Sequence, residues 1–163
     1  MPARPEDLFA RLAELGIATE THRHPPVFTV EEAKRLRGDI AGAHCKNLLL
    51  IDHKGLLWLV VAREDTPLDM KALRGRLGSG RLSFAKPERL REALGVGPGE
   101  VTPFALINDG ARAVRVALER GMMEGTGPLN FHPLTNAATT SIAADGLLAF
   151  IRAGGHEPLV VDL

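Results

Sequence analysis

The amino-acid sequence predicts a single α+β domain. Segments with helical periodicity and short apolar segments typical of strands are mixed without a strict βαβ rhythm, which argues against a doubly wound parallel sheet. Two apolar runs within 44–65 are separated only by DHKG, a connection typical of a β-hairpin. With 163 residues and no repeat, low-complexity tract or long linker, the chain is expected to fold as one domain, 1–163.

Two helices and a strand are expected before the hairpin. Residues 5–17 begin with a proline and two acidic residues and place leucine and phenylalanine side chains along one helical face. Residues 18–24 alternate small and polar side chains as a short strand, which two prolines end. Thr29 and Glu32 form a capping-box pattern, so a second helix is expected to begin directly after Thr29 and to close at Gly38.

The rest of the chain is assigned from the same signals. Prolines near the start and glycines at the end of charged segments indicate helices, and short apolar stretches between turn residues indicate strands. In chain order we expect a helix at 66–78, a strand at 82–85, a helix at 86–95, an ordered loop leading into a short strand at 95–109, strands at 113–119, 128–135 and 139–144, a helix at 143–155 and a strand at 158–163.

Charge and hydropathy exclude some classes of protein. Twenty basic and twenty acidic residues cancel, unlike the balance of a strongly basic nucleic-acid binder. Residues 71–92 carry seven Lys or Arg against two Glu, a local balance of +5, which fits either a solvated helical face or a contact with phosphates. No apolar run approaches the roughly 20 residues that span a bilayer. One cysteine and no secretion-type leader favour the cytoplasm.

Few residues show a familiar catalytic spacing. The six histidines do not form a zinc motif, and no phosphate-binding loop, nucleophile elbow or dinucleotide fingerprint occurs. We therefore expect no metal and no cofactor. Cys45 follows His44, but neighbouring residues of a strand point to opposite faces, so a buried, unreactive thiol is the better interpretation.

Lys46 is the most unusual charged residue, because it stands just ahead of the apolar run Leu48–Ile51. Strand alternation places it on the face of His44, opposite Cys45 and Asn47. A buried charge without a partner is costly, so the ammonium group either reaches water or meets an anion. Pattern alone leaves both possibilities open.

Two further segments could contact a ligand. Gly97 and Gly99 in GPGEVTP can bring backbone amides close to an oxyanion, because no Cβ blocks the approach. His132 lies in NFHPLTN between a phenylalanine typical of strands and a proline that would end one, where side chains often face a pocket. Taken alone, such a histidine is more often structural than catalytic.

Three segments occur in the order found in the YbaK/ProX family, the bacterial editing domains that hydrolyse mischarged prolyl-tRNA. They are GAHCKNLLLID at 42–52, GEVTPFALIND at 99–109 and NFHPLTNAATTSIAADGLLAFI at 130–151. Within the family the chain resembles the free-standing alanyl-tRNA(Pro) deacylase (ProXp-ala, PrdX) more than the cysteinyl-tRNA(Pro) deacylase YbaK. This distinction depends on Asn47 after Lys46 and on the Phe-His-Pro segment around His132.

The resemblance implies a curved mixed β-sheet, a partly closed barrel, surrounded by helices and holding a small pocket. It implies a catalytic role for three residues that match family motifs, Lys46, Gly99 and His132. The implied substrate contacts are Phe28, Asn47, Thr102, Pro103 and Asn136, and the candidate tRNA contacts are Arg35, Arg37, Arg74, Arg76 and Arg81. Glu119 stands where the family often has aspartate after a V-x-V-x-L strand, and we assign it no role.

The implied activity is metal-independent hydrolysis of the ester of Ala-tRNA(Pro) by water, helped by the 2′-hydroxyl of the tRNA. The implied partner is tRNA(Pro) mischarged with alanine, with no membrane and no stable protein partner. A pocket fitted to a methyl group would accept alanine and exclude proline. The alternatives are a deacylase for Cys-tRNA(Pro) or another small amino acid, a non-enzymatic module that binds tRNA or a ligand, and an unrelated nucleic-acid binder.

Overall fold

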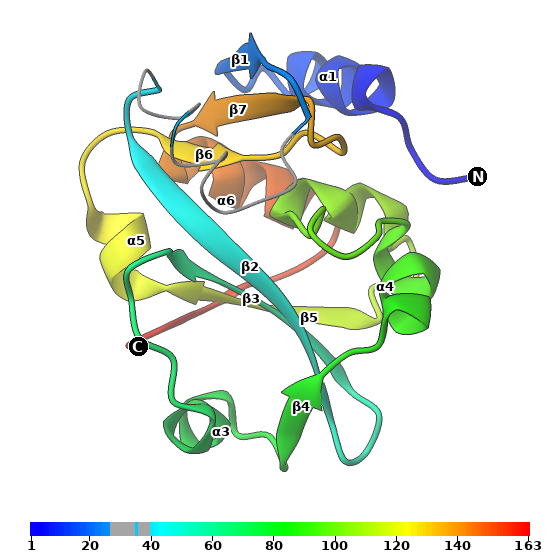
Figure 1. Cartoon of the computed structure of the whole chain (residues 1–163), viewed down its shortest axis with the longest axis vertical. Coiled ribbons are helices and arrows are strands. Elements are labelled where there is room, and N and C mark those ends of the chain that lie inside the picture. The colour runs from blue at the N-terminus through cyan, green and yellow to red at the C-terminus, as the bar shows by residue number, and fades with distance from the viewer. Residues whose placement is uncertain (27–34, 36–39) are drawn as a thin grey trace.

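The computed structural model describes residues 1–26, 35 and 40–163, and these ranges build an eight-stranded mixed sheet flanked by helices (Figure 1). The strands are hydrogen-bonded in the order β1-β7-β6-β2-β3-β5-β8, and β4 pairs with β2 off this path. Their bounds are Thr19–Arg23 (β1), Ala43–Asp52 (β2), Leu57–Arg63 (β3), Leu82–Phe84 (β4), Val114–Glu119 (β5), Leu129–Phe131 (β6), Ala138–Ile142 (β7) and Leu159–Val161 (β8).

The long strand β2 connects the two parts of the sheet, and Figure 1 shows it running from the β6 side to the hairpin with β3. Its first two residues, Ala43 and His44, pair in parallel with β6. From Cys45 to Ile51 it pairs antiparallel with β3 without a bulge, and its last three residues also pair with β4. Within the described ranges, residues 45–49 therefore have a strand neighbour on the β3 side alone.

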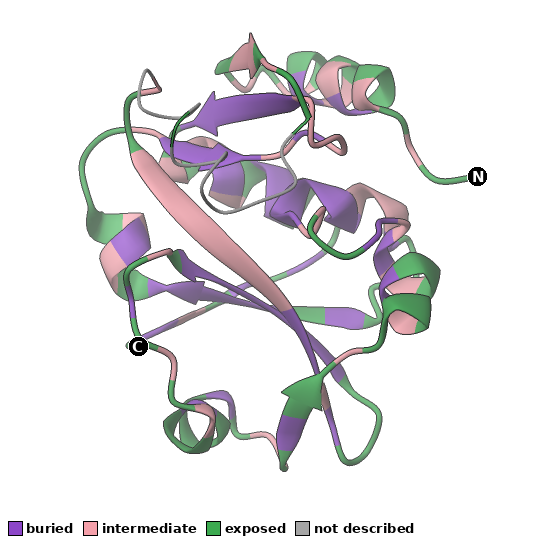
Figure 2. Ribbon diagram, viewed as in Figure 1, coloured by how far each residue is buried: buried purple, intermediate pink, exposed green. Residues whose placement is uncertain are grey.

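Two apolar clusters cover the two faces of β2. Figure 2 shows most of β2 at intermediate burial, whereas β7 is buried. The larger cluster takes Leu49 from β2 and is closed by residues of α1, α4 and α6. Phe104 is fully buried in it and meets Phe131 and Phe150 edge to face, at ring-centroid distances of 5.9 and 5.5 Å. The smaller cluster takes Leu50 and lies between β3 and α3. The split matches the alternation of side chains along a strand.

Caps and prolines explain where the helices begin and end. The side chain of Asp69 accepts hydrogen bonds from the amides of Lys71 and Ala72 at the start of α3, and Gly78 ends that helix in the left-handed conformation. Pro87 occupies the first turn of α4. The helical bounds are Pro5–Glu14 (α1), Met70–Leu77 (α3), Pro87–Leu94 (α4), Pro103–Asn108 (the 3-10 helix η2), Arg120–Glu124 (α5) and Ala144–Ala153 (α6).

Most expected elements are confirmed, including the hairpin, the helix at 66–78 and the final strand. The short strand expected within 95–109 is wrong. That segment forms η2, because Thr102 accepts the amide of Phe104 and Pro103 fits the first turn of a helix. The short helix α5 was not expected at all. The capping-box helix after Thr29 lies outside the described residues.

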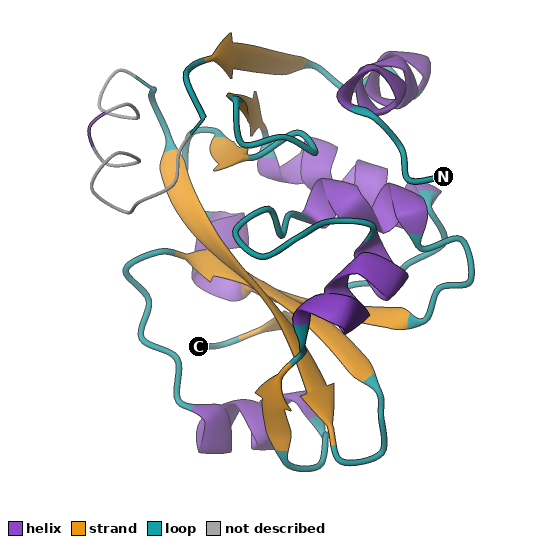
Figure 3. Cartoon of the chain, turned by 45° about the vertical axis from the view of Figure 1, so that its right-hand side comes forward, coloured by secondary structure: helices purple, strands orange, loops and turns teal. Residues whose placement is uncertain are grey.

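The expected mixed sheet with surrounding helices is confirmed, but the sheet is open and does not form a closed barrel. Its end strands β1 and β8 pair, within the described residues, with β7 and β5 respectively and not with each other. Figure 3 shows the helices placed around the strands on several sides. None of the helices in the described ranges is long and apolar enough to cross a membrane.

Candidate active site

Lys46 lies where β2 leaves β6 and continues along β3. Its register partner on β3 is Ala62. Because Cys45 packs on the larger cluster and Leu48 on the smaller one, Lys46 projects from the face that carries the smaller cluster. The predicted alternation around Lys46 is therefore confirmed.

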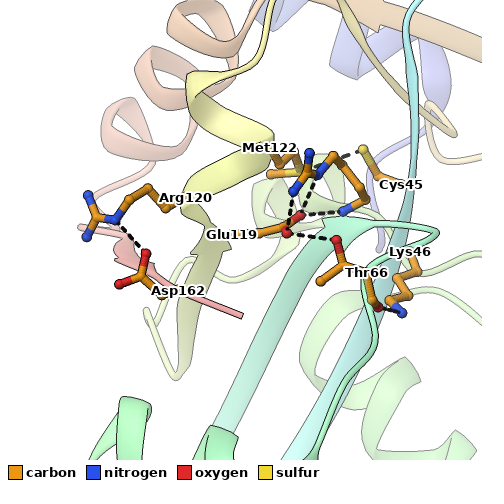
Figure 4. Close-up of polar contacts among 8 residues, drawn as sticks. Cys45, Lys46, Thr66, Glu119, Arg120, Met122 and Asp162 are labelled. Atoms are coloured by element: carbon orange, nitrogen blue, oxygen red, sulfur yellow. Dashed lines mark hydrogen bonds and ion pairs between the residues drawn. The ribbon is translucent and has the colours of Figure 1, made fainter.

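The ammonium group of Lys46 does not extend into open solvent. The side chain is half-buried, and Nζ donates a hydrogen bond to the backbone carbonyl of Thr66 (Figure 4). This acceptor is neutral, so it orients the ammonium without neutralising its charge. Since an ammonium has three N–H donors, two remain to meet an anion or a carbonyl brought by a ligand.

Thr66 belongs to a polar network centred on Glu119, the last residue of β5 (Figure 4). The Thr66 hydroxyl donates to Glu119 Oε2 at 2.7 Å. Arg63 donates to the same carboxylate through its backbone amide, Nε and Nη2, at 2.9, 3.1 and 2.9 Å. The chain of contacts therefore runs from Arg63 through Glu119 and Thr66 to Lys46.

Glu119 is ionised in this network. Burial raises the pKa of its carboxyl, but the hydrogen bonds from Arg63 and Thr66 outweigh the burial and leave the pKa below the usual glutamate value. The hydrogen bond and charge of Glu119 in turn raise the pKa of Arg63. With both carboxylate oxygens already accepting hydrogen bonds, Glu119 is a fixed anion and not a free general base.

Lys46 and His132 occupy equivalent positions relative to the parallel pairing of β2 with β6. His44 is paired with Asn130, and each candidate follows the paired residue of its own chain segment by two positions. The Nδ1 atom of His132 lies 3.1 Å from the carbonyl oxygen of Ala138. A carbonyl only accepts, so Nδ1 carries the proton, and in the neutral ring Nε2 is left as an acceptor.

His24, which directly follows β1, contacts the ring of His132, a role that the sequence did not indicate. The two rings meet edge to face with centroids 6.4 Å apart. His24 Nδ1 lies 2.9 Å from the carbonyl of Pro25, and its Nε2 lies 2.9 Å from the hydroxyl of Thr139. The ring is therefore held at both nitrogens and limits the space beside His132.

Comparison with known proteins assigns this arrangement to a family. The family model "Aminoacyl-tRNA editing domain" matches residues 24–150, which include Lys46, Glu119 and His132. The chain belongs to the aminoacyl-tRNA editing domain family. The resemblance to YbaK/ProX editing domains is thus confirmed, while the family match does not separate the alanine-specific subtype from its relatives.

The editing domain has relatives along nearly its whole length. It is 40% identical over 156 residues to the "Prolyl-tRNA synthetase associated domain-containing protein 1" of Bos taurus, covering 93% of this chain and 91% of the relative. It is 34% identical over 157 residues to the "Prolyl-tRNA editing protein ProX" of Acetoanaerobium sticklandii, covering 96% and 95%. A crystal structure described as a candidate trans-editing enzyme for prolyl tRNA synthetase shares its fold, with a TM-score of 0.72, 22% identity and coverage of 100% and 99%.

The predicted loop of the editing domain at 99–103 divides into an exposed and a buried part. Gly99 is exposed, and an added Cβ at this position would meet open space. Its φ of +81° is in the left-handed region, and this backbone conformation is what favours glycine there. Thr102 and Pro103 are buried and begin η2. Gly99 is therefore exposed to solvent, whereas Thr102 and Pro103 anchor the loop in the fold.

The predicted substrate contacts are not all on one face. Asn47 projects with Cys45 from the side of β2 opposite Lys46, and its Oδ1 is buried without a hydrogen-bond partner among the described residues. Asn136 is half-buried in the loop between β6 and β7. Phe28 lies outside the described residues. The substrate roles of these three residues remain predictions.

Cys45 is the unreactive thiol that the sequence predicted. Its Sγ lies 3.6 Å from Met122 Sδ, and burial raises the pKa of the thiol to about 12. A thiol with so high a pKa is protonated at neutral pH and is a poor nucleophile.

The predicted tRNA contacts lie at two places. Arg74 and Arg76 are exposed on α3, and Arg81 is exposed just before β4, at the end of the hairpin remote from β6 (Figure 1). Arg35 is exposed, and Arg37 lies outside the described residues. The basic residues of the α3–β4 region therefore form a surface apart from Lys46.

Proposed function

We propose that this editing domain is a deacylase that hydrolyses the ester of Ala-tRNA(Pro). The observation that carries the proposal is the half-buried side chain of Lys46, whose ammonium is held on a neutral carbonyl just beyond the point where β2 leaves β6, the strand that precedes His132. Such an ammonium is oriented but still has charge to offer to the terminus of an aminoacylated RNA. The names of the relatives, which refer to prolyl-tRNA editing, support the same class of substrate.

The reaction requires water to attack the ester carbonyl. The carbonyl carbon gains the water oxygen, the bond to the ribose oxygen breaks, and the ribose oxygen takes a proton, so the products are alanine and tRNA with a free terminal hydroxyl. Lys46 holds the 3′ end through a phosphate or the ester carbonyl, and the backbone at Gly99 positions the developing oxyanion. The 2′-hydroxyl of the tRNA orients the water, and the activated ester needs no metal.

His132 shapes the pocket in this mechanism. Its ring is fixed by the Ala138 carbonyl and by His24, and the acceptor at Nε2 suits a water molecule or the ammonium of the alanyl group. Phe28 and Asn136 are proposed to limit the space for the side chain of the amino acid, whereas Asn47, on the face of β2 opposite Lys46, is not assigned to this pocket. A cavity matched to a methyl group rejects proline by steric clash, which protects correctly charged tRNA.

The exposed arginines of the α3–β4 region, together with Arg35 and Arg37, are proposed to contact the tRNA backbone. Contacts of this kind neutralise phosphates and release counterions, which makes binding depend on salt. The domain would act in the cytoplasm, where charged tRNA circulates, and would need no stable protein partner.

The decisive experiment measures deacylation of Ala-, Cys-, Ser- and Pro-tRNA(Pro) by the purified chain. We expect Ala-tRNA(Pro) to be hydrolysed fastest, Pro-tRNA(Pro) to be spared, and a metal chelator to leave the rate unchanged. Faster release of cysteine would overturn the alanine assignment. Binding of charged tRNA with hydrolysis no faster than the spontaneous rate would overturn the enzymatic function and favour a binding module.

A further inference from the structure

Glu119 accepts hydrogen bonds from both ends of the turn at 63–66. The last residue of this turn, Thr66, provides the carbonyl that Lys46 binds. One carboxylate oxygen, Oε1, accepts the backbone amide of Arg63 at the start of the turn. The other, Oε2, accepts the hydroxyl of Thr66 at its end. The glutamate side chain is 2% exposed, so water does not compete for these contacts.

Further contacts make this turn rigid relative to β2. The amide of Thr66 donates to the carbonyl of Arg63 at 3.1 Å, and the amide of Glu64 donates to the carbonyl of His44 at 2.9 Å. His44 is two residues from Lys46 on the same strand. The Thr66 carbonyl is therefore fixed from β5 by Glu119 and from β2 by His44.

A glycine close to Glu119 leaves space for the Arg63–Glu119 ion pair. The Arg63 guanidinium lies against Gly121, and an added Cβ there would overlap Nη2. Any larger residue at 121 would require the guanidinium to shift. The last residues of β3 and β5, Arg63 and Glu119, thus form an ion pair at the turn, and Gly121 leaves space for it.

We infer that Glu119 is a positioning residue for Lys46, acting through the Thr66 turn. A buried ion pair gives little net stability, because the loss of hydration offsets the attraction, so stability alone is a weak reason for this network. Its geometric result is specific: one carbonyl is held in place, and it directs the ammonium of Lys46. The catalytic consequence of the inference rests on the proposed function, whereas the ordering of Lys46 does not.

The sharpest variant is Thr66→Val, which keeps the shape of the side chain and removes the hydroxyl that Glu119 accepts. Thr66→Ser restores the hydroxyl and is the matched conservative variant. Asp162→Asn is the control, because it breaks an exposed ion pair with Arg120 in the same region without touching the turn (Figure 4). Thermal unfolding of every variant shows that it is folded before its rates are compared.

Two measurements test the inference. The first is single-turnover deacylation of Ala-tRNA(Pro), with and without Lys46→Ala in the background. Since a misplacement of about 1 Å can cost up to about 100-fold in rate, we expect Thr66→Val to lower the maximal single-turnover rate constant about tenfold, with little change in the enzyme concentration that gives half of that rate. Thr66→Ser should recover most of the rate, and Thr66→Val should cost nothing more once Lys46 is absent.

The second measurement is NMR relaxation of the Lys46 ε-methylene group, assigned from the spectrum of Lys46→Arg. We expect this group to be ordered in the wild type and in Thr66→Ser, and mobile in Thr66→Val. Equal order in all three proteins, or an equal loss of rate with and without Lys46, would overturn the inference. If Lys46→Ala keeps the wild-type rate, the proposed function fails, and the relaxation data still decide whether Glu119 orders Lys46.

Discussion

A buried carboxylate lies near each end of β5. Asp109 precedes the strand and Glu119 is its last residue, and the two make different connections. Asp109 is 5% exposed and Glu119 is 2% exposed. Asp109 accepts the amides of Ala113 and Val114 at 3.0 and 2.9 Å and lies 2.9 Å from His156 Nε2. Both groups therefore close a turn by accepting backbone amides and bind one basic side chain.

The difference lies in what each pair is connected to. His156 and Asp109 are both 4% exposed at the side chain, and together they fasten the segment before β8 to the start of β5. Arg63 is 48% exposed, and the Glu119 network continues through Thr66 to Lys46. A buried carboxylate in contact with one basic side chain is thus shared by both ends of β5. The Glu119 end differs in the exposure of its basic partner and in its connection, through Thr66, to the ammonium of Lys46.

The largest effect on the hydrolysis rate is expected from removing the ammonium group of Lys46, to which the Glu119 network is connected. Lys46→Ala should lower the rate of Ala-tRNA(Pro) hydrolysis by about 100-fold or more, because one preorganised charged contact to the transition state is lost. Lys54→Ala is the matched control, since Lys54 is exposed at the tip of the same hairpin. Equal rates for the two variants in a single-turnover assay would remove Lys46 from the active site.

A substitution at Asp109 should lower the stability of the fold and leave the hydrolysis rate nearly unchanged. Asp109→Asn leaves His156 without its carboxylate and weakens two caps, so we expect a loss of about 3 kcal/mol in the free energy of unfolding. The hydrolysis rate per folded molecule should stay within about twofold of the wild type. Urea unfolding and the deacylation assay measure the two quantities. A large fall in rate without a fall in stability would place Asp109 in the active site as well.

The smallest expected effect is the pH dependence of the stability that Glu119 contributes. Because folding lowers the pKa of Glu119, its contribution to stability is present above the unfolded pKa of about 4.5 and is lost as the pH falls through the lower folded pKa. The gap in unfolding free energy between wild type and Glu119→Gln should therefore narrow on acidification from pH 7. Other carboxylates titrate in both proteins and cancel in this difference. A gap that stays constant with pH would show that the ionised carboxylate does not stabilise the fold.

Much of the fold could be predicted because the signals are local. Pro87 and Gly95 delimit α4, DHKG produces the β2–β3 hairpin, and the aliphatic residues around Lys46 alternate between two clusters as a strand requires. The segment before Asp109 misled the prediction, since its apolar composition suits a strand. The Thr102 cap and Pro103 turned it into a 3-10 helix.

The sequence by itself determined most of the elements, the unreactive Cys45 and the choice of Lys46 and His132 as candidates, since each depends on neighbours within a few positions. Only the tertiary structure decided that Lys46 meets a carbonyl 20 residues away and that this residue is held by Glu119, a further 53 residues along. Contacts over such separations arise from the pairing order of the strands. That order is set by packing of the whole sheet, which no local pattern of residue types encodes.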